Sequence, residues 1–382
     1  MICEELFSKI DALNNVYCDL WESVCNMESP TANKAAVDEV GNVFIKMAND
    51  RGWLVEVFEH TKAGNAICIT INPEANAEPV VFSGHIDTVH PIGLFGTPAV
   101  RRDETCIYGP GVMDCKGGVV ASFMALDALE QCRFTARPVK LIIQTDEETG
   151  SSTSGLETVK FMCEKSKNAV AFLNTEGIQG NTAVLVRKGI LRYRFTVYGR
   201  AAHSAACASG VNAIAEAAHK ILRLETLKDA NTLTCNCGTI EGGTVANTVA
   251  ERCSFTADFR FSSEDDYQRA QALAEEISNQ NMLEGSHCVL ERMSYRPAMP
   301  LSQRNVALLE TMNRIYGDNE LPQLTARTCL SGSDAAYITQ AEIPCVDNLG
   351  VDGGKIHSVN EFAYLDSLAA CAKRLAAVAY CI

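Results

Sequence analysis

The fold is decided by residues 79–87, which read PVVFSGHID. The run from Val80 to Phe82 is typical of a buried strand, and His85 and Asp87 follow it directly. In an α/β sheet the carboxyl ends of parallel strands meet at one edge, and ligands bind just outside that edge. The stretch therefore predicts a strand that carries a histidine and an aspartate to a binding edge.

Working outward from this strand, apolar runs alternate with helical patterns along the chain. The alternation predicts an α/β domain, in which a mostly parallel sheet has helices on both faces. Helical spacing predicts helices at 3–27, 31–49 and 119–129, and β-rich runs predict strands at 53–58, 66–71, 139–144, 170–173 and 343–346.

The pattern changes near Arg187, where a β-α-β-β-α-β order begins. We therefore expect a ferredoxin-like lid or dimerisation domain at 187–297, inserted into a catalytic metal-binding domain formed by 1–186 and 298–382. Within the insertion we expect strands at 189–198, 233–240, 245–261 and about 288–293, and helices at 211–224 and 265–277.

Composition limits the class of protein. A formal net charge of −14 over 382 residues argues against nucleic acid and anionic membranes as partners. No run of about eighteen apolar residues predicts a membrane span. The 17 cysteines lack zinc-finger spacing, and residues 1–5, MICEE, lack the features of a secretory signal. A reducing, cytoplasmic location is therefore expected.

Side chains of metal-ligand type follow other predicted strands or lie in glycine-rich turns. Read singly, the pair His85 and Asp87 is more often structural, and Asp114 could simply cap a helix. Read together, the set supplies a histidine and a carboxylate for each of two metals, with Asp114 as a bridge. These residues are Asp114 in GPGVMDCKGG (109–118), Glu147 and Glu148 in DEETG (146–150), Glu176 in LNTEG (173–177) and His357 in GGKIHS (353–358).

The acids Glu147 and Glu148 end a predicted buried strand, where adjacent carboxylates repel each other unless a cation compensates them. One acid can bind metal while its neighbour moves a proton. We assign Glu148 to the metal and Glu147 to general base and acid chemistry. Asp87 is expected to bind the second ring nitrogen of His85 and so fix its tautomer.

These motifs, in this order, resemble the family of co-catalytic dinuclear zinc peptidases and deacylases, which includes glutamate carboxypeptidase, acetylornithine deacetylase, succinyl-diaminopimelate desuccinylase and aminoacylase. The resemblance is strongest to bacterial glutamate carboxypeptidase. It implies two divalent ions, Zn²⁺ or in its place Co²⁺ or Mn²⁺. It places His85 and Glu176 on one ion and Glu148 and His357 on the other. It also implies that Asp114 bridges them and that a cis peptide bond follows Asp114.

The resemblance extends into the insertion. It implies that His203, in GRAAHS (199–204), reaches across a homodimer to the partner's active site and stabilises an oxyanion. It implies that Asn247 and Arg260 bind the substrate carboxylate, and that Gly332 and Ser333 belong to a loop that approaches the substrate. Read without the family, His203 is an exposed turn histidine and Arg260 a surface charge.

The sequence thus predicts a metal-dependent hydrolase that cleaves an amide bond and releases an amino acid. A glutamate-type carboxypeptidase acting on small peptides or N-acyl amino acids with a free carboxylate fits best. An N-acyl-amino-acid deacylase, of the acetylornithine deacetylase or desuccinylase type, would use the same ligands and base and stays an alternative. A catalytically silent binding protein is a remote one, since no ligand is missing. Cys115 departs from the pattern, because relatives often have Asp, Asn or Met there.

Overall fold

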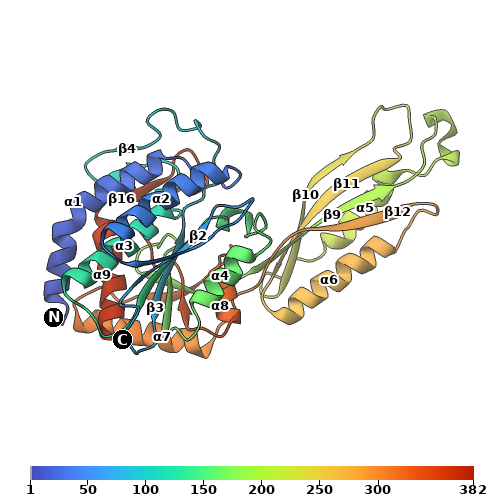
Figure 1. The fold of residues 1–382 in the computed structure, drawn as a ribbon. Coiled ribbons are helices and arrows are strands. Elements are labelled where there is room, and N and C mark those ends of the chain that lie inside the picture. Colours follow the sequence, from blue (N-terminus) through green and yellow to red (C-terminus); the bar gives the residue numbers. More distant parts are fainter. Residues whose placement is uncertain (1) are drawn as a thin grey trace. The chain divides into compact units, whose positions relative to one another are not determined.

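A six-stranded sheet forms the centre of the larger unit, in the order β1-β2-β6-β3-β7-β14 (Figure 1). This computed structural model describes residues 2–382. The β6-β3, β3-β7 and β7-β14 pairs are parallel and the two pairs at the β1 edge antiparallel, which confirms the mostly parallel sheet. The strands are β1 (Leu54–Phe58), β2 (Ala66–Ile71), β3 (Val80–His85), β6 (Val139–Gln144), β7 (Ala171–Asn174) and β14 (Cys345–Val346).

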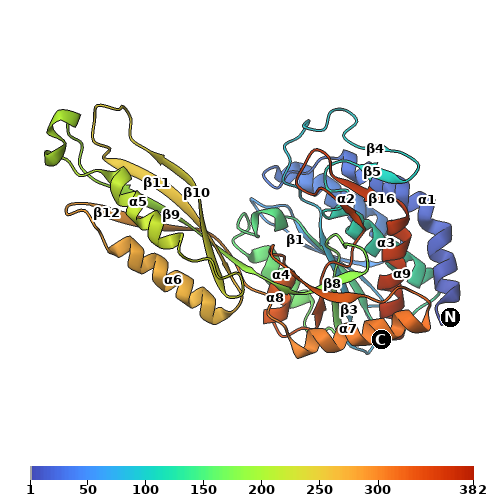
Figure 2. The same cartoon turned by 180° about the vertical axis from the view of Figure 1, so that it is seen from behind.

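Helices cover both faces of this sheet (Figure 2). The Ser83 hydroxyl contacts the sulfur of Met162 in α4, at 3.8 Å, whereas a side chain at the next residue, Gly84, would meet Val119 of α3. Successive strand residues point to opposite faces, so α3 and α4 lie on opposite sides. The helices of this unit are α1 (Glu4–Asn26), α2 (Lys34–Asp50), α3 (Lys116–Gln131), the 3₁₀ turn η1 (Glu147–Thr149), α4 (Glu157–Lys165), α7 (Gln303–Asp318), α8 (Ala335–Gln340) and α9 (Asp366–Cys381).

Smaller strands complete the larger unit, and two of them flank His357. A four-stranded sheet has the order β15-β16-β5-β4, and β8 pairs with β13. The segment between β15 and β16 contains His357. Among residues 2–382, no helix combines the length and apolar character that crossing a bilayer requires. The bounds are β4 (Arg101–Arg102), β5 (Cys106–Tyr108), β8 (Thr182–Arg187), β13 (Thr325–Cys329), β15 (Gly353–Gly354) and β16 (Phe362–Tyr364).

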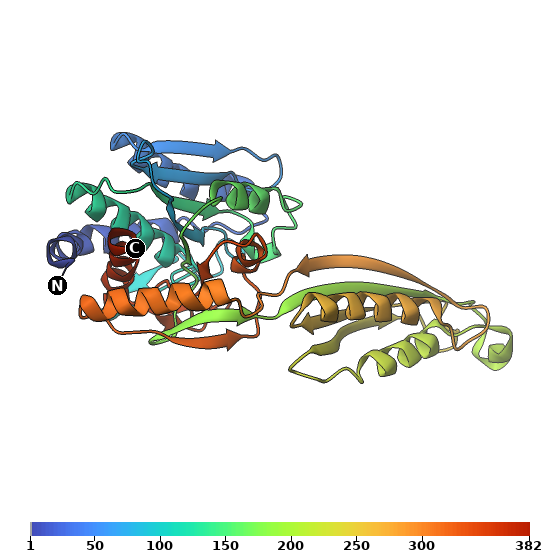
Figure 3. The ribbon, with the colours of Figure 1, turned by 90° about the horizontal axis from the view of Figure 1, so that it is seen from below.

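The second unit comprises Val186–Pro300 and Cys329–Ala336, so it includes a short segment that the sequence analysis placed in the larger domain. Its order is β-α-β-β-α-β, and its antiparallel sheet runs β10-β11-β9-β12, the ferredoxin-like arrangement. Helices α5 and α6 cover one face (Figure 3), where Phe195 and Phe255 stack in the core. The elements are β9 (Gly189–Tyr198), η2 (Ser204–Ser209), α5 (Ala213–Leu224), β10 (Leu233–Gly242), β11 (Arg252–Phe261), α6 (Glu264–Asn279) and β12 (His287–Arg296).

The strand expected over 245–261 begins only at Arg252, so its first seven residues were predicted wrongly. In that segment the backbone N–H of Val249 donates to the carbonyl of Ala202, and the carbonyl of Ala250 accepts from Ala213. The segment therefore pairs with the chain that leaves β9 instead of extending β11. This places Asn247 in a loop.

Candidate metal centre

Side chains from separate loops meet beyond the carboxyl ends of β6, β3 and β7. These three strands are parallel neighbours, so the residues that follow them reach the same edge of the sheet. The converging side chains are His85 at the end of β3, Asp114 before α3, Glu148 in η1 after β6, Glu176 after β7 and His357 after β15.

Asp114 lies at the centre of the group. One of its carboxylate oxygens is 3.1 Å from Nε2 of His85, and the other is 3.1 Å from Nε2 of His357. Each histidine also has its own carboxylate: Glu176 at 3.6 Å from His85 and Glu148 at 3.1 Å from His357. The group thus consists of two His–Glu pairs that share one aspartate, the arrangement that a two-metal site uses.

Asp87 contacts both His85 and the turn that contains Glu147 and Glu148. Nδ1 of His85 lies 3.3 Å from the Asp87 carboxylate and 3.1 Å from its carbonyl oxygen, so Nδ1 donates to Asp87 while Nε2 faces Asp114. The same carboxylate accepts the backbone N–H groups of Glu147 and Glu148 and the hydroxyl of Thr31. Burial alone would raise the pKa of Asp87, but these hydrogen bonds, led by that from His85, lower it. Asp87 therefore ties the histidine to the turn that carries both acids.

The charge of the group fits divalent cations. Burial raises the pKa of Glu176 well above its ordinary value and that of Glu148 to about 7, and the nearby Asp114 adds to both shifts. Hydrogen bonds that His357 donates to the carboxylates of Asp114 and Glu148 raise its pKa to about 11. Carboxylates crowded in a buried space have such shifts when no cation balances them. Imidazole nitrogens and carboxylate oxygens are also ligands that zinc accepts.

The three consecutive acids, Asp146, Glu147 and Glu148, have different surroundings. Asp146 is fully buried and accepts hydrogen bonds from the hydroxyl of Thr158 and the backbone of Ser154, at 2.7 and 2.9 Å. Glu147 is 8% exposed and follows it in the turn η1. Asp146 therefore has a structural role, whereas Glu147 and Glu148 lie in a turn whose backbone donates hydrogen bonds to Asp87.

Glu361 is a buried acid that sequence reasoning missed. Its carboxylate accepts backbone N–H groups from Met113 and Asp114, at 2.9 and 3.1 Å, and from Gly111 at 3.3 Å. Burial raises the pKa of Glu361 to about 8. Glu361 thus fixes the loop that presents Asp114. Its only signal in the sequence was its place four residues after His357.

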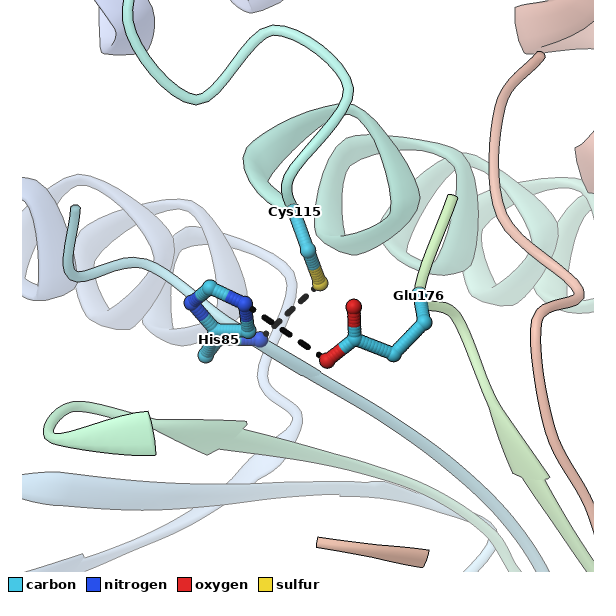
Figure 4. Close-up of side chains that lie close together, drawn as sticks. All are labelled: His85, Cys115 and Glu176. Carbon is cyan, nitrogen blue, oxygen red and sulfur yellow. Dashed lines mark hydrogen bonds and ion pairs between the residues drawn. The ribbon is translucent and has the colours of Figure 1, made fainter. Parts of the chain in front are cut away.

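Cys115 was noted in the sequence only as a departure from the family pattern. The peptide bond before it is cis, as the resemblance implied. Its sulfur accepts the backbone N–H of His85 at 3.2 Å, and it offers a ligand atom within 4.8 Å of those of His85 and Glu176 (Figure 4). Burial raises the pKa of the Cys115 thiol to about 12. The thiol thus contacts the backbone at the end of β3 and lies beside the side chains of His85 and Glu176.

His203 and Asn247 lie together in the second unit. Both are exposed, and the backbone N–H of Ser204 donates to the carbonyl of Asn247 at 2.9 Å. Nδ1 of His203 accepts the backbone N–H of Ala205, so the ring proton is on Nε2, where it can be donated. This pair lies beyond the end of β9, which finishes at Tyr198.

Arg260 lies at the other end of the same sheet, where it pairs with Ile190 at the start of β9. It lies eight residue steps from Arg252, the first residue of β11, which is about 27 Å along the strand. Its Nε and Nη2 bind the carboxylate of Asp258 at 2.6 and 3.3 Å, and that carboxylate also binds Arg192. A small substrate therefore cannot contact both Arg260 and Asn247 of one copy of this unit.

Gly332 and Ser333 belong to the second unit and lie at the Arg260 end of it. Nη1 of Arg260 is 3.5 Å from the carbonyl of Leu330 in the same loop. The carbonyl of Gly332 accepts a hydrogen bond from Arg187, and a side chain at Gly332 would meet Cδ of Arg296 at 2.6 Å. Ser333 is fully buried. The loop is thus packed among arginines, which favours an anionic group beside it.

Residues 81–380 match peptidase family M20/M25/M40, and the chain belongs to this family. It is similar to carboxypeptidase G2 of Pseudomonas sp. (strain RS-16), with 26% identity over 363 residues, 93% of this chain and 85% of the relative. As a member of this family, the chain is a hydrolase of peptide or amide bonds that depends on divalent metal ions.

Solved structures share the fold. Aminopeptidase PepT from Bacillus cereus superposes with a TM-score of 0.77 at 22% identity, covering 95% of this chain and 97% of that one. The M20 family metallo-carboxypeptidase Sso-CP2 from Sulfolobus solfataricus gives a TM-score of 0.73 at 17% identity, with coverages of 95% and 98%. At such identities the likeness concerns the fold alone.

Proposed function

We propose that the protein is a two-zinc carboxypeptidase of the glutamate carboxypeptidase type. It would release an amino acid from small peptides or N-acyl amino acids that carry a free carboxylate. The observation that carries the proposal is the position of Asp114, whose two oxygens each lie 3.1 Å from a different histidine. The similarity to carboxypeptidase G2 supports it.

The metal ligands divide into two sets under this proposal. His85 and Glu176 would hold one ion, Glu148 and His357 the other, and Asp114 both. The ions supply a Lewis acid for the scissile carbonyl and acidify a water molecule. Two divalent ions carry four positive charges, and the carboxylates of Asp114, Glu148, Glu176 and Glu147 carry four negative charges, so the centre is close to neutral.

Glu147 moves the proton in this scheme. Its carboxylate takes a proton from the attacking water and returns it to the leaving nitrogen, which leaves as an amine. Asp87 keeps His85 in the tautomer that leaves Nε2 without a proton, and it holds the turn of Glu147 in place.

A nearly neutral metal centre does not attract a substrate carboxylate, so a separate cation is required. We propose that Arg260 is that cation. Asp258 binds one edge of its guanidinium and orients it, and Arg192 shares the same aspartate. Two arginines against one aspartate leave a net positive charge beside the loop of Gly332 and Ser333. A substrate carboxylate would bind there through charge-assisted hydrogen bonds.

A substrate panel tests this function. Peptides ending in Glu, Asp or an aliphatic residue, together with N-acyl amino acids, should separate carboxypeptidase from deacylase. Arg260→Ala should lower kcat/KM about 10- to 100-fold for substrates with a free carboxylate, the value of a lost charge-assisted pair. For the amidated forms of these substrates the wild type and the variant should be equal. Hydrolysis of N-acyl amino acids alone would favour the deacylase, and no hydrolysis with metal bound would favour the silent binding protein.

We further propose that the protein is a homodimer in which His203 and Asn247 act on the partner's substrate. Their exposure, their contact with each other and their distance from Arg260 within one copy support this. Nε2–H of His203 would donate to the oxyanion of the partner's substrate. The cytoplasmic location also stays a prediction, and fractionation of the source cells would check it.

Mixing two inactive variants tests the dimer. Glu147→Gln and His203→Ala should each lose most activity alone. Co-expressed, they should recover about a quarter of wild-type turnover, because half of the dimers are mixed and each mixed dimer has one complete site. Co-expression of Glu147→Gln with Glu148→Gln is the matched control and should recover nothing. Full activity of His203→Ala by itself would refute the role.

A further inference from the structure

A pair of thiols joins helices α1 and α9, outside the metal centre. The sulfur of Cys3, which precedes α1, lies 3.5 Å from the sulfur of Cys381, the last residue of α9. Cys3 is 1% exposed, whereas Cys381 is half-buried and open to small solutes. A disulfide has sulfurs about 2.05 Å apart, so bond formation needs about 1.5 Å of approach.

Asn319 holds this pair in place. Its side-chain oxygen accepts the backbone N–H of Cys3 at 2.8 Å, and its amide nitrogen donates to the carbonyl of Ile315 at 2.9 Å. Asn319 is 1% exposed, so the arrangement is shielded from competing water. Hydrogen bonds from Cys3 and Asn319 lower the pKa of the Cys381 thiol to about 7, although burial opposes the shift. The accessible sulfur is thus the one with thiolate character, which a reactive cysteine needs.

We propose that Cys3 and Cys381 are an oxidation site that closes to a disulfide when the protein meets hydrogen peroxide. The Cys381 thiolate attacks one peroxide oxygen, the O–O bond breaks and hydroxide leaves, so that Cys381 becomes a sulfenic acid. The Cys3 sulfur then attacks the Cys381 sulfur, the S–O bond breaks, and the departing oxygen takes the Cys3 proton and leaves as water. The first hydroxide takes up the proton that Cys381 released on becoming a thiolate, which gives a second water. Two thiols lose two electrons to one peroxide, so the step is balanced.

The site is separate from the hydrolytic chemistry. Cys132 follows the carboxyl end of α3, and its charge raises the pKa of Cys3, so these two cysteines lie near each other. Asp114 and Cys115 precede the other end of α3. The 16 residues of α3 span about 24 Å. Closure of the disulfide would link α1 to α9 and restrict the unfolded chain, since 378 positions separate the two cysteines. Its expected effect is on stability.

Peptide mapping tests the proposal directly. After reduction and brief peroxide treatment, the thiol count should fall by two from 17. Trypsin should release residues 1–9 linked to residues 375–382, each of which contains a single cysteine. The melting temperature of the oxidised protein should rise by several degrees, and dithiothreitol should reverse the rise. Cys3→Ser and Cys381→Ser should each abolish the linked peptide and the rise.

Cys207→Ser is the matched control, because Cys207 is exposed and far along the chain from both cysteines. It should leave the linked peptide and the temperature shift unchanged. The proposal is overturned if Cys207 is oxidised while residues 1–9 and 375–382 stay unlinked. It is also overturned if Cys3 links to Cys132 instead, which would give residues 1–9 joined to residues 117–133.

Discussion

Replacing Glu147 with glutamine should reduce turnover by a factor of about 10² to 10⁴ while the bound metal stays unchanged. Glutamine keeps the shape of the side chain but cannot accept the proton of the attacking water. The proposed metal ligands Asp114, Glu148 and His357 keep their mutual distances, and the backbone N–H at 147 can still donate to Asp87. Steady-state kinetics and elemental analysis of the dialysed protein provide the two measurements.

Glu164→Gln is the matched control for this variant, because Glu164 is an exposed acid of α4 and the substitution is the same. It should have wild-type kinetics. Appreciable turnover in Glu147→Gln with the metal still bound would assign the base to another residue.

Replacing Asp114 with asparagine should remove both metal ions, not one. The carboxylate presents one oxygen to each histidine, at 3.1 Å in both cases, and an amide keeps a single weaker oxygen donor. Loss of an outer-shell partner commonly costs 10- to 100-fold in metal affinity, so loss of the bridge should cost more than about 100-fold. Turnover should fall below detection at metal concentrations that saturate the wild type.

The fold of this variant should survive, because Glu361 binds the backbone of the Asp114 loop and not its side chain. Circular dichroism and metal titration would separate loss of metal from unfolding. Asp50→Asn, at an exposed position that pairs with Lys46, should behave as the wild type. If Asp114→Asn retained both ions, the bridge would have to be another residue.

The sequence predicted much of the larger unit because its signals are local. Buried parallel strands are short apolar runs, and in β6 and β7 the expected bounds fall within one residue of those in the structure. His85, Glu148 and Glu176 follow such strands directly, so the topology brings them to one edge. Their roles as ligands stay predictions, whereas their closeness is a property of the fold.

Other parts of the site had no local signal. Glu361 acts by accepting backbone N–H groups some 250 positions away, and only the folded chain shows which carboxylate does so. The strand over 245–261 was extended too far because Val245 and Val249 continue the apolar alternation of β11. The backbone N–H of Val249 instead donates to the carbonyl of Ala202, a contact that the strand pattern alone does not reveal. Asn247 was consequently placed on the wrong kind of element.

The hydrogen bonds from the Asp114 loop to Glu361 bear on when the metal centre can form during synthesis. His85, Asp114, Glu148 and Glu176 leave the ribosome well before His357 and Glu361, which follow Glu176 by 181 and 185 residues. A nascent chain that ends before them has neither the second histidine nor the anchor of the bridging loop. Metal uptake should therefore wait until residue 361 has been made, so that chains truncated before His357 cannot become active hydrolases.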